Sequence, residues 1–420
     1  MNEKQKNLIQ DLILKKNNFK SKYFYPLLDN AFSKEDLLSG IKVLISGKLT
    51  MSNKTREFEK KFAKRVGSKY ALMVNSGSSA NLLATFAACN PLRKNRFKRG
   101  DEVLIPAVCW STSLWPLVQS GLKPVFVDVE KDTLNVNAEL LIKKITKKTK
   151  VIMLVHVLGN STDIDKIKKV AKKNKIIIIE DTCEALGAKY KNKYLGTFGD
   201  FGTYSFYFSH QITSGEGGMV VCNNEEDYEL LYSMRSHGWS RGLKSQKKIE
   251  KKHPTLDPKF IFVNSGFNLR PTDIVASIGN SQLKRLNNFI KIRNLNSSKI
   301  KDGLKKSKKW KNQFSFQQIR SNVKTSPFGF PIFMHKKFMK KKNKFIQMLD
   351  KHGVETRPII SGNFLNQPSI KLFKLQNQNQ KFPQAQEVEN LGFFIGLHTK
   401  SIKPKTLNRL TDILLKIDSI

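Results

Sequence analysis

The sequence predicts an α/β fold built on a mainly parallel sheet. Two continuous apolar runs rich in β-branched residues, Val151–Leu158 and Ile176–Glu180, have the length of strands that are covered on both faces. Asp163–Lys173, between them, has a helical pattern, and such alternation is typical of parallel α/β sheets. With 420 residues, 39% of them hydrophobic, the chain can bury a sizeable core, which excludes a wholly disordered protein.

The other expected elements continue this alternation. Phe58 and Phe62 are four residues apart, which predicts a helix at Lys54–Val66 with both rings on one face. Further along, the pattern predicts a strand at Ala71–Val74, an apolar helix at Ala80–Cys89, and strands at Glu102–Pro106 and Pro124–Val129.

The expected organisation is an N-terminal segment (residues 1–40), a large domain (41–285) and a smaller C-terminal α/β domain (286–420). The Lys- and Asn-rich stretch Lys284–Asn312 contains a long polar helix that leads into the C-terminal domain.

The charge balance allows two interpretations. Lysine and arginine (75) outnumber aspartate and glutamate (34), so the formal net charge is +41. One interpretation is a nucleic-acid or anionic-membrane partner, and the other is a solvated basic surface that attracts an anionic small substrate. The lysines are spread along the chain without a nucleic-acid-binding motif, which favours the second interpretation and no nucleic-acid partner.

Membrane and metal-binding classes are not indicated. No apolar run reaches the roughly 18–20 residues of a membrane span, and the N-terminus lacks a signal-peptide pattern. The four cysteines form no CxxC motif, so neither a zinc module nor a compact iron–sulfur motif is visible. We therefore expect no metal, no membrane partner and a reducing cytoplasmic location.

Three segments carry candidate chemistry. Asn75–Ala80 places small residues between a strand and a helix, where Gly77 lets backbone N–H groups approach a phosphate; a structural helix cap is the alternative. Asp181 follows a predicted strand and could pair with a protonated ring nitrogen, with Glu184 nearby on the following turn; a helix cap is the alternative. In Gly199–Val221, Ser205 could contact phosphate and His210 follows an aromatic strand.

Together these segments resemble the DegT/DnrJ/StrS sugar aminotransferases, a family of fold-type I pyridoxal-phosphate (PLP) enzymes. The resemblance runs over nearly the whole chain, in order. It comprises ISGKLT, FEKKFAKRVGSKYALMVNSGSSANL, PAVCWSTSLW, VHVLGN, EDTCEALGA, SFYFSHQITSGEGGMVV, RSHGWSR, GFNLRPTDIVASIGNSQL and VETRPIISGN. It implies the fold-type I architecture, with a large PLP-binding domain and a smaller C-terminal domain.

The resemblance also implies roles for single residues. Gly77, Ser78 and Ser205 would hold the cofactor phosphate, and Trp110 would stack on the pyridine ring. Asp181 would bond the ring nitrogen, and Glu184 stands near the ring hydroxyl, where the family often has Gln. Asn268 would reach the phosphate of a neighbouring subunit, which implies a homodimer.

His210 departs from the family's aminotransferases, which have the Schiff-base lysine at this position. Imidazole has no primary amine, although it can still move protons near neutral pH. A Lys-to-His change resembles the nucleotide-sugar 3-dehydratases of the family. One branch, the CDP-4-keto-6-deoxyglucose type, carries an iron–sulfur cluster whose cysteine ligands follow the position of Arg235. The corresponding region of this sequence has no cysteine, so the chain is nearer the GDP-4-keto-6-deoxymannose type, which has no cluster.

The implied reaction needs pyridoxal and pyridoxamine phosphate and L-glutamate. Glutamate converts the cofactor to its pyridoxamine form, which condenses with the C4 ketone of a nucleotide-diphosphate sugar. His210 then removes a proton from the cofactor and returns one to the departing C3 hydroxyl, and hydrolysis releases a 3-deoxy-4-keto sugar and ammonia. Such a product serves O-antigen or other surface-glycan synthesis.

Arg241 and Arg357 are candidates for binding diphosphate or sugar oxygens, because guanidinium groups recognise such oxygens with two parallel hydrogen bonds; a surface ion pair is the alternative. Two other functions stay open at this point. One is a CDP-type dehydrase or a sugar 4-aminotransferase, and the other is a catalytically silent PLP fold with a regulatory or nucleic-acid-binding role.

Overall fold

The computed structural model describes residues 3–5, 7, 9, 11, 21–28, 32–375 and 380–420. Its largest sheet has seven strands in the order β1-β9-β8-β5-β4-β2-β3. These strands are β1 (Tyr70–Val74), β2 (Glu102–Pro106), β3 (Lys123–Val127), β4 (Thr149–Val155), β5 (Ile177–Asp181), β8 (Phe201–Ser205) and β9 (Gly218–Cys222). All neighbouring pairs from β3 to β8 are parallel, and β9 runs antiparallel to both β8 and β1. The prediction of a mainly parallel sheet is confirmed.

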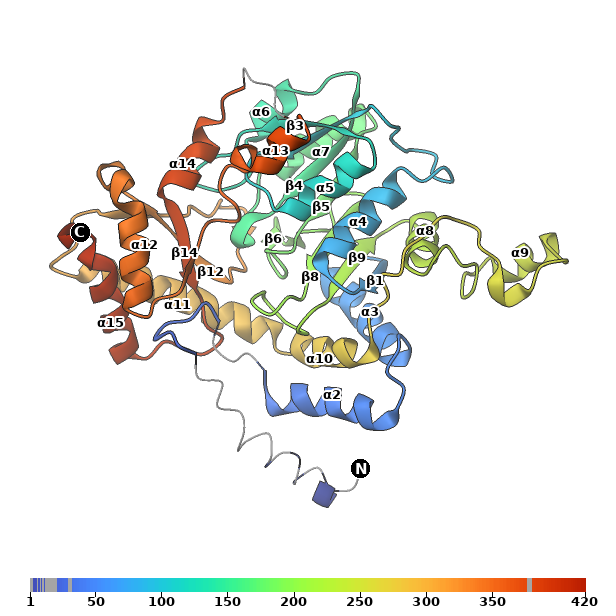
Figure 1. Ribbon diagram of the computed structural model, residues 1–420, viewed down its shortest axis with the longest axis horizontal. Helices are drawn as coiled ribbons and strands as arrows, with labels where there is room; N and C mark the ends of the chain where they lie inside the picture. The colour runs from blue at the N-terminus through green and yellow to red at the C-terminus, as the bar shows by residue number, and fades with distance from the viewer. Residues whose placement is uncertain are drawn as a thin grey trace.

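Helices accompany the strands of this sheet along the chain, and those predicted at Lys54–Val66, Ala80–Cys89 and Asp163–Lys173 are among them (Figure 1). They are α3 (Asn53–Val66), α4 (Gly77–Ala88), α5 (Ser111–Gln119), α6 (Ala138–Lys143), α7 (Ile164–Lys173), α8 (Glu225–Arg235), α9 (Gln246–Lys252) and α10 (Asp273–Leu283). Phe58 and Phe62 on α3 are fully buried, as their spacing predicts. The helix expected from Ala80 begins earlier, at Gly77, because Ser76 caps it there.

Two predicted strands are too long. The strand expected at Pro124–Val129 ends at Val127. The apolar run Val151–Leu158 was expected to be extended throughout, but β4 ends at Val155 and Val157–Gly159 forms a 3₁₀ turn. Leu158 has a φ of 48°, in the left-handed region that a leucine rarely adopts. Hydrophobic sequence alone does not reveal this turn, because its residues remain buried after the strand ends.

The helix α11 (Leu286–Lys306) leads into a second sheet, ordered β10-β12-β14-β13. Its strands are β10 (Phe314–Phe316), β12 (Gly329–Met334), β13 (Thr356–Arg357) and β14 (Gly392–Gly396). A small third sheet consists of β6 (Lys189–Tyr190), β7 (Lys193–Tyr194) and β11 (Val323–Lys324). The remaining helices are α12 (Lys342–Lys351), α13 (Pro368–Leu372), α14 (Pro383–Leu391) and α15 (Pro404–Leu414). The second sheet is entirely antiparallel.

The N-terminal residues associate with both parts of the chain. Tyr25 bridges to Val354, and its hydroxyl donates to the carbonyl of Gly396 at 3.1 Å. The helix α2 (Lys34–Ser46) packs instead against α10, where Asp36 accepts a hydrogen bond from Gln282. A continuous hydrophobic core joins the seven-stranded sheet to the second sheet, whereas α9 projects away on the opposite side (Figure 1). Among the described residues, no helix is long and apolar enough to cross a membrane.

Candidate active site

The carboxyl end of β5 carries a buried carboxylate. Asp181 Oδ2 accepts hydrogen bonds from Asn81 Nδ2 on α4 (2.8 Å) and Ser113 Oγ on α5 (2.7 Å). Its Oδ1 accepts the backbone N–H of Cys183 at 3.1 Å, and Thr203 Oγ1 on β8 donates to Asn81 Oδ1 at 2.6 Å. A carboxylate has about four acceptor positions, so these three donors orient it and leave room for one more.

The amino end of α4 forms a narrow cradle beside β8. Gly77 is the first residue of this helix, and a Cβ added to it would lie 2.5 Å from Ser205 Cβ and 3.0 Å from Cys183 Sγ. The helix therefore approaches the strand this closely only with glycine at position 77. Ser78 follows on the exposed side, where its hydroxyl donates to Thr112 Oγ1 at 3.3 Å. A helix N-terminus with neighbouring hydroxyl groups can bind a phosphate.

His210 lies in the turn after β8. Its ring packs edge-on against Phe328 and Tyr207, with centroid distances of 5.3 Å and 5.9 Å, and its Nδ1 is buried without a hydrogen-bond partner. Burial lowers the pKa of His210 to about 4; the negative charge of Asp181 opposes this shift and the positive charge of Arg293 adds to it. The imidazole is therefore neutral at physiological pH and can accept a proton.

Glu184 lies one turn after Asp181 and is held by the strained 3₁₀ turn. The backbone N–H of Leu158 donates to Glu184 Oε2 at 3.1 Å. Burial raises the pKa of Glu184 to about 7; this N–H opposes the shift, and the charge of Asp181 adds to it. Near neutral pH the carboxyl group is about half protonated, so it can donate or accept a hydrogen bond.

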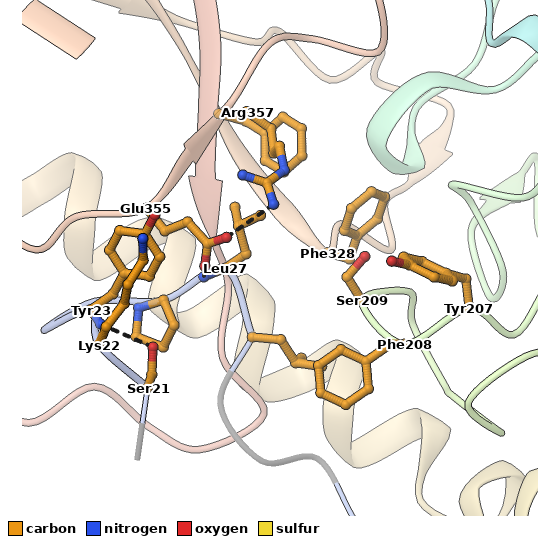
Figure 2. A pocket seen from close by; sticks show the side chains of 13 residues that line it. Ser21, Lys22, Tyr23, Leu27, Tyr207, Phe208, Ser209, Phe328, Glu355 and Arg357 are labelled. Atoms are coloured by element: carbon orange, nitrogen blue, oxygen red, sulfur yellow. Dashed lines mark hydrogen bonds and ion pairs between the residues drawn. The ribbon is translucent and has the colours of Figure 1, made fainter. Parts of the chain in front are cut away.

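A cavity of about 410 Å³ adjoins the His210 turn. Figure 2 shows Tyr207 and Ser209 of this turn, with Phe328, facing the N-terminal residues Ser21–Tyr23 across it. Arg357 also lines the cavity and forms an ion pair with Glu355 at 3.0 Å. The cavity combines aromatic rings with a carboxylate and a guanidinium group, a composition suited to a sugar with polar substituents.

The other predicted site residues are more exposed to solvent. Trp110 is 55% exposed and directly precedes α5, one turn before Ser113, at the same edge of the sheet. Asn268 is exposed and accepts a hydrogen bond from Arg270 at 3.0 Å, and Arg241 is exposed in the loop before α9. Of the predicted site residues, Arg357 lines the cavity, whereas Asn268 and Arg241 do not.

Sequence reasoning missed several residues around the site. Asn81, Ser113 and Thr203 position Asp181, yet they come from three elements and show no signal beyond being polar residues in apolar segments. His156 Nε2 pairs with buried Glu180 at 3.0 Å, and the backbone N–H of His156 donates to the Asp181 carbonyl. Within the described residues, no group of three or more His, Cys, Asp or Glu side chains could hold a metal ion.

Comparison with known proteins identifies the same family along most of the chain. The model of the DegT/DnrJ/EryC1/StrS aminotransferase family matches residues 31–414. The chain is 37% identical to GDP-4-keto-6-deoxy-D-mannose 3-dehydratase of Escherichia coli O55:H7 over 376 residues, covering 89% of this chain and 95% of the relative.

Solved structures give a consistent result. The E. coli GDP-4-keto-6-deoxy-D-mannose-3-dehydratase with bound hydrated PLP has a TM-score of 0.85 and 35% identity, covering 94% of this chain and 100% of that one. A histidine-to-asparagine mutant of GDP-4-keto-6-deoxymannose-3-dehydratase with bound GDP-perosamine has a TM-score of 0.85 and 37% identity, covering 93% and 100%. The resemblance in the motifs is thus confirmed in sequence and in three dimensions, and the chain belongs to the DegT/DnrJ/EryC1/StrS aminotransferase family.

Proposed function

We propose that this protein is a PLP- and PMP-dependent 3-dehydratase that converts a nucleotide-linked 4-keto-6-deoxyhexose to the 4-keto-3,6-dideoxyhexose, with L-glutamate as amino donor. The observation that carries the proposal is a histidine at position 210, where the family's aminotransferases have lysine, inside a site whose other parts remain. The similarity to 3-dehydratases that act on GDP-4-keto-6-deoxy-D-mannose supports it and favours GDP as the nucleotide.

The residues present fit this cofactor. Asp181 keeps one acceptor position for the pyridine nitrogen, and the cradle of Gly77, Ser78 and Ser205 suits its phosphate. Trp110 offers an exposed indole face for the ring, and Glu184 has a pKa matched to a hydrogen bond with the ring hydroxyl. When bound, the cofactor would act as an electron sink for bonds next to its amino group. Without a lysine at position 210, it would be held non-covalently.

His210 would serve first as a base and then as an acid. Its pKa of about 4 keeps the imidazole neutral, so one ring nitrogen carries no hydrogen and can accept a proton. This atom would take the proton from the cofactor's methylene carbon. The protonated ring would then give a proton to the departing C3 hydroxyl, because a desolvated imidazolium readily releases its proton. Water must enter afterwards to release ammonia.

The cavity beside His210 would hold the sugar. Its lining includes Tyr207–Ser209, which directly precede the proposed base, and Phe328, whose ring packs against the imidazole. Arg357 is its guanidinium group for sugar or diphosphate oxygens, and Arg241 is a second candidate on the exposed loop. The relative with bound GDP-perosamine supports a nucleotide sugar as substrate, and the reaction would serve O-antigen synthesis.

A homodimer would complete the site. Exposed apolar side chains occur on α2 and on the projecting segment around α9, and exposed clusters of this kind are typical of interfaces. They are Leu44, Ile45, Leu256, Phe260 and Phe262. Asn268 lies next to this segment and would reach the cofactor phosphate of the second copy.

All four cysteines are free thiols, which supports a reducing, cytoplasmic location.

The test is product analysis by mass spectrometry. Purified protein would be incubated with PLP, L-glutamate and, separately, GDP-4-keto-6-deoxymannose or CDP-4-keto-6-deoxyglucose. We expect a sugar that lacks one oxygen, with release of ammonia. An amino-sugar product would overturn the proposal in favour of transamination, and unchanged sugars with both substrates would refute it for these nucleotides.

Two variants sharpen this test. His210→Asn keeps a polar side chain of similar size but removes the base, so we expect PLP binding to persist while dehydration falls about 100-fold or more. His335→Asn is the matched control. His335 is exposed at the end of β12, where its Nδ1 accepts the backbone N–H of Lys337 at 3.2 Å; asparagine can cap in the same way, so activity should be retained.

A further inference from the structure

Arg293 is a buried cation that contacts the turn of the catalytic histidine. It lies on α11 and is 1% exposed. Its Nη1 donates to the Gln211 carbonyl at 2.9 Å, its Nη2 to the His210 carbonyl at 3.2 Å, and its Nε to the Leu397 carbonyl at 3.0 Å. Because burying a charge is costly unless it is hydrogen-bonded, these three backbone carbonyls stabilise the buried guanidinium group.

The same turn is held from the other side. Gln211 is 1% exposed, and its Nε2 donates to the carbonyls of Glu184 (2.6 Å) and Ser326 (2.9 Å). Phe328, two residues after Ser326 and directly before β12, packs edge-on against the His210 ring. The turn is thus hydrogen-bonded through Gln211 to Glu184 and to the segment before β12. Through Arg293 it is also linked to Leu397, which follows β14.

We propose that Arg293 is a positioning residue for His210, which it ties to the second sheet through the Leu397 carbonyl and keeps next to a fixed positive charge. This inference rests on the proposed function, in which His210 moves the protons. Arg293 does not touch the reacting atoms; it acts through the backbone of the turn and through its charge.

The geometry gives Arg293 two separable effects. The fork of three donors sets the place of the imidazole, and a displacement of about 1 Å can cost 100-fold in rate. The positive charge of Arg293 also lowers the pKa of His210, whereas the carboxylate of Asp181, at the end of β5, raises it. The phenol of Tyr207 is the other titratable group beside the imidazole and lies on the same turn. A lysine at position 293 would keep the positive charge but not the planar set of N–H donors, and a methionine would keep neither.

The experiment compares Arg293→Lys and Arg293→Met with the wild-type enzyme saturated with PLP. We expect kcat to fall about 10- to 100-fold in both variants, with the KM for the nucleotide sugar little changed. The low-pH limb of the kcat/KM profile should keep its midpoint in Arg293→Lys and move to higher pH in Arg293→Met. A general loss of structure would not separate the two variants in this way.

A second measurement does not depend on activity. NMR titration of the protein with ¹³C-labelled histidine follows its seven imidazoles, and the signal that disappears in His210→Asn identifies His210. We expect its titration midpoint to rise in Arg293→Met only. An unchanged midpoint and an unchanged kcat in a folded Arg293→Met protein would overturn the inference. A shifted midpoint without any dehydration in the wild type would instead refute the proposed function, and would leave only the effect of the Arg293 charge on His210.

Discussion

Gly77→Ala offers a sharp test of the phosphate cradle. The added Cβ would lie 2.5 Å from Ser205 Cβ, 2.9 Å from Ser205 Oγ and 3.0 Å from Cys183 Sγ. Carbon atoms pack best at about 3.5–4.0 Å, so the overlap with Ser205 Cβ is about 1 Å. Ser205 ends a buried strand and cannot retreat, so the first turn of α4 must move away from β8.

The magnitude follows from this overlap. Inserting a methyl group into a packed site typically costs about 1–3 kcal/mol, and we expect a loss of this size in the free energy of unfolding. The displaced N–H groups should also weaken PLP binding about 10- to 100-fold, since each 1.4 kcal/mol changes a dissociation constant about tenfold. Absorbance titration with PLP measures the affinity, and thermal unfolding without cofactor measures the stability.

Gly40→Ala is the matched control, because Gly40 lies inside α2 and the nearest neighbours of an added Cβ would be side-chain carbons: Ile278 Cδ1 at 3.3 Å, Ile278 Cγ1 at 3.4 Å and Ile274 Cγ2 at 3.8 Å. This substitution should leave PLP affinity unchanged and preserve or slightly raise stability, as alanine is the better helix former. If Gly77→Ala bound PLP as tightly as the wild type, the reasoning about the cradle would be refuted.

Three further predictions concern the remaining groups of the site. The pKa of Glu184 rises from an ordinary 4.5 to about 7 on folding, so its stabilising contribution is complete below pH 4.5 and is lost as pH rises through 7. Glu184→Gln should therefore flatten the thermal stability profile over this range, by up to about 3 kcal/mol; an unchanged slope would contradict the assignment. Arg357→Ala should raise the KM for the nucleotide sugar without changing PLP affinity, and should alter stability by less than about 0.5 kcal/mol because this side chain is 55% exposed. Mixing refolded Asn268→Ala and His210→Asn subunits should restore about a quarter of wild-type dehydration, because a hybrid dimer keeps one intact site; no recovery would argue against a shared site.

The order of the elements was predictable from local patterns. The apolar runs at β4 and β5 and the Phe58–Phe62 spacing on α3 identify strands and helices correctly, because burial imposes a period on the sequence. The end of β4 was predicted wrongly, since the buried 3₁₀ turn at Leu158 is as apolar as the strand. The antiparallel pairing of the second sheet was likewise not visible, because pairing joins segments that are far apart in the chain.

The sequence by itself determined the chemistry of this protein. It supplies a histidine without an amine at position 210, a carboxylate at Asp181 and a glycine at position 77, and these identities do not depend on the fold. Only the tertiary structure decided the setting of these groups. Desolvation lowers the pKa of His210, Asn81 and Ser113 orient Asp181, and Arg293 reaches the His210 turn from α11. Such effects arise from contacts over distances of 68 to 100 residues in the chain, and no local pattern records them.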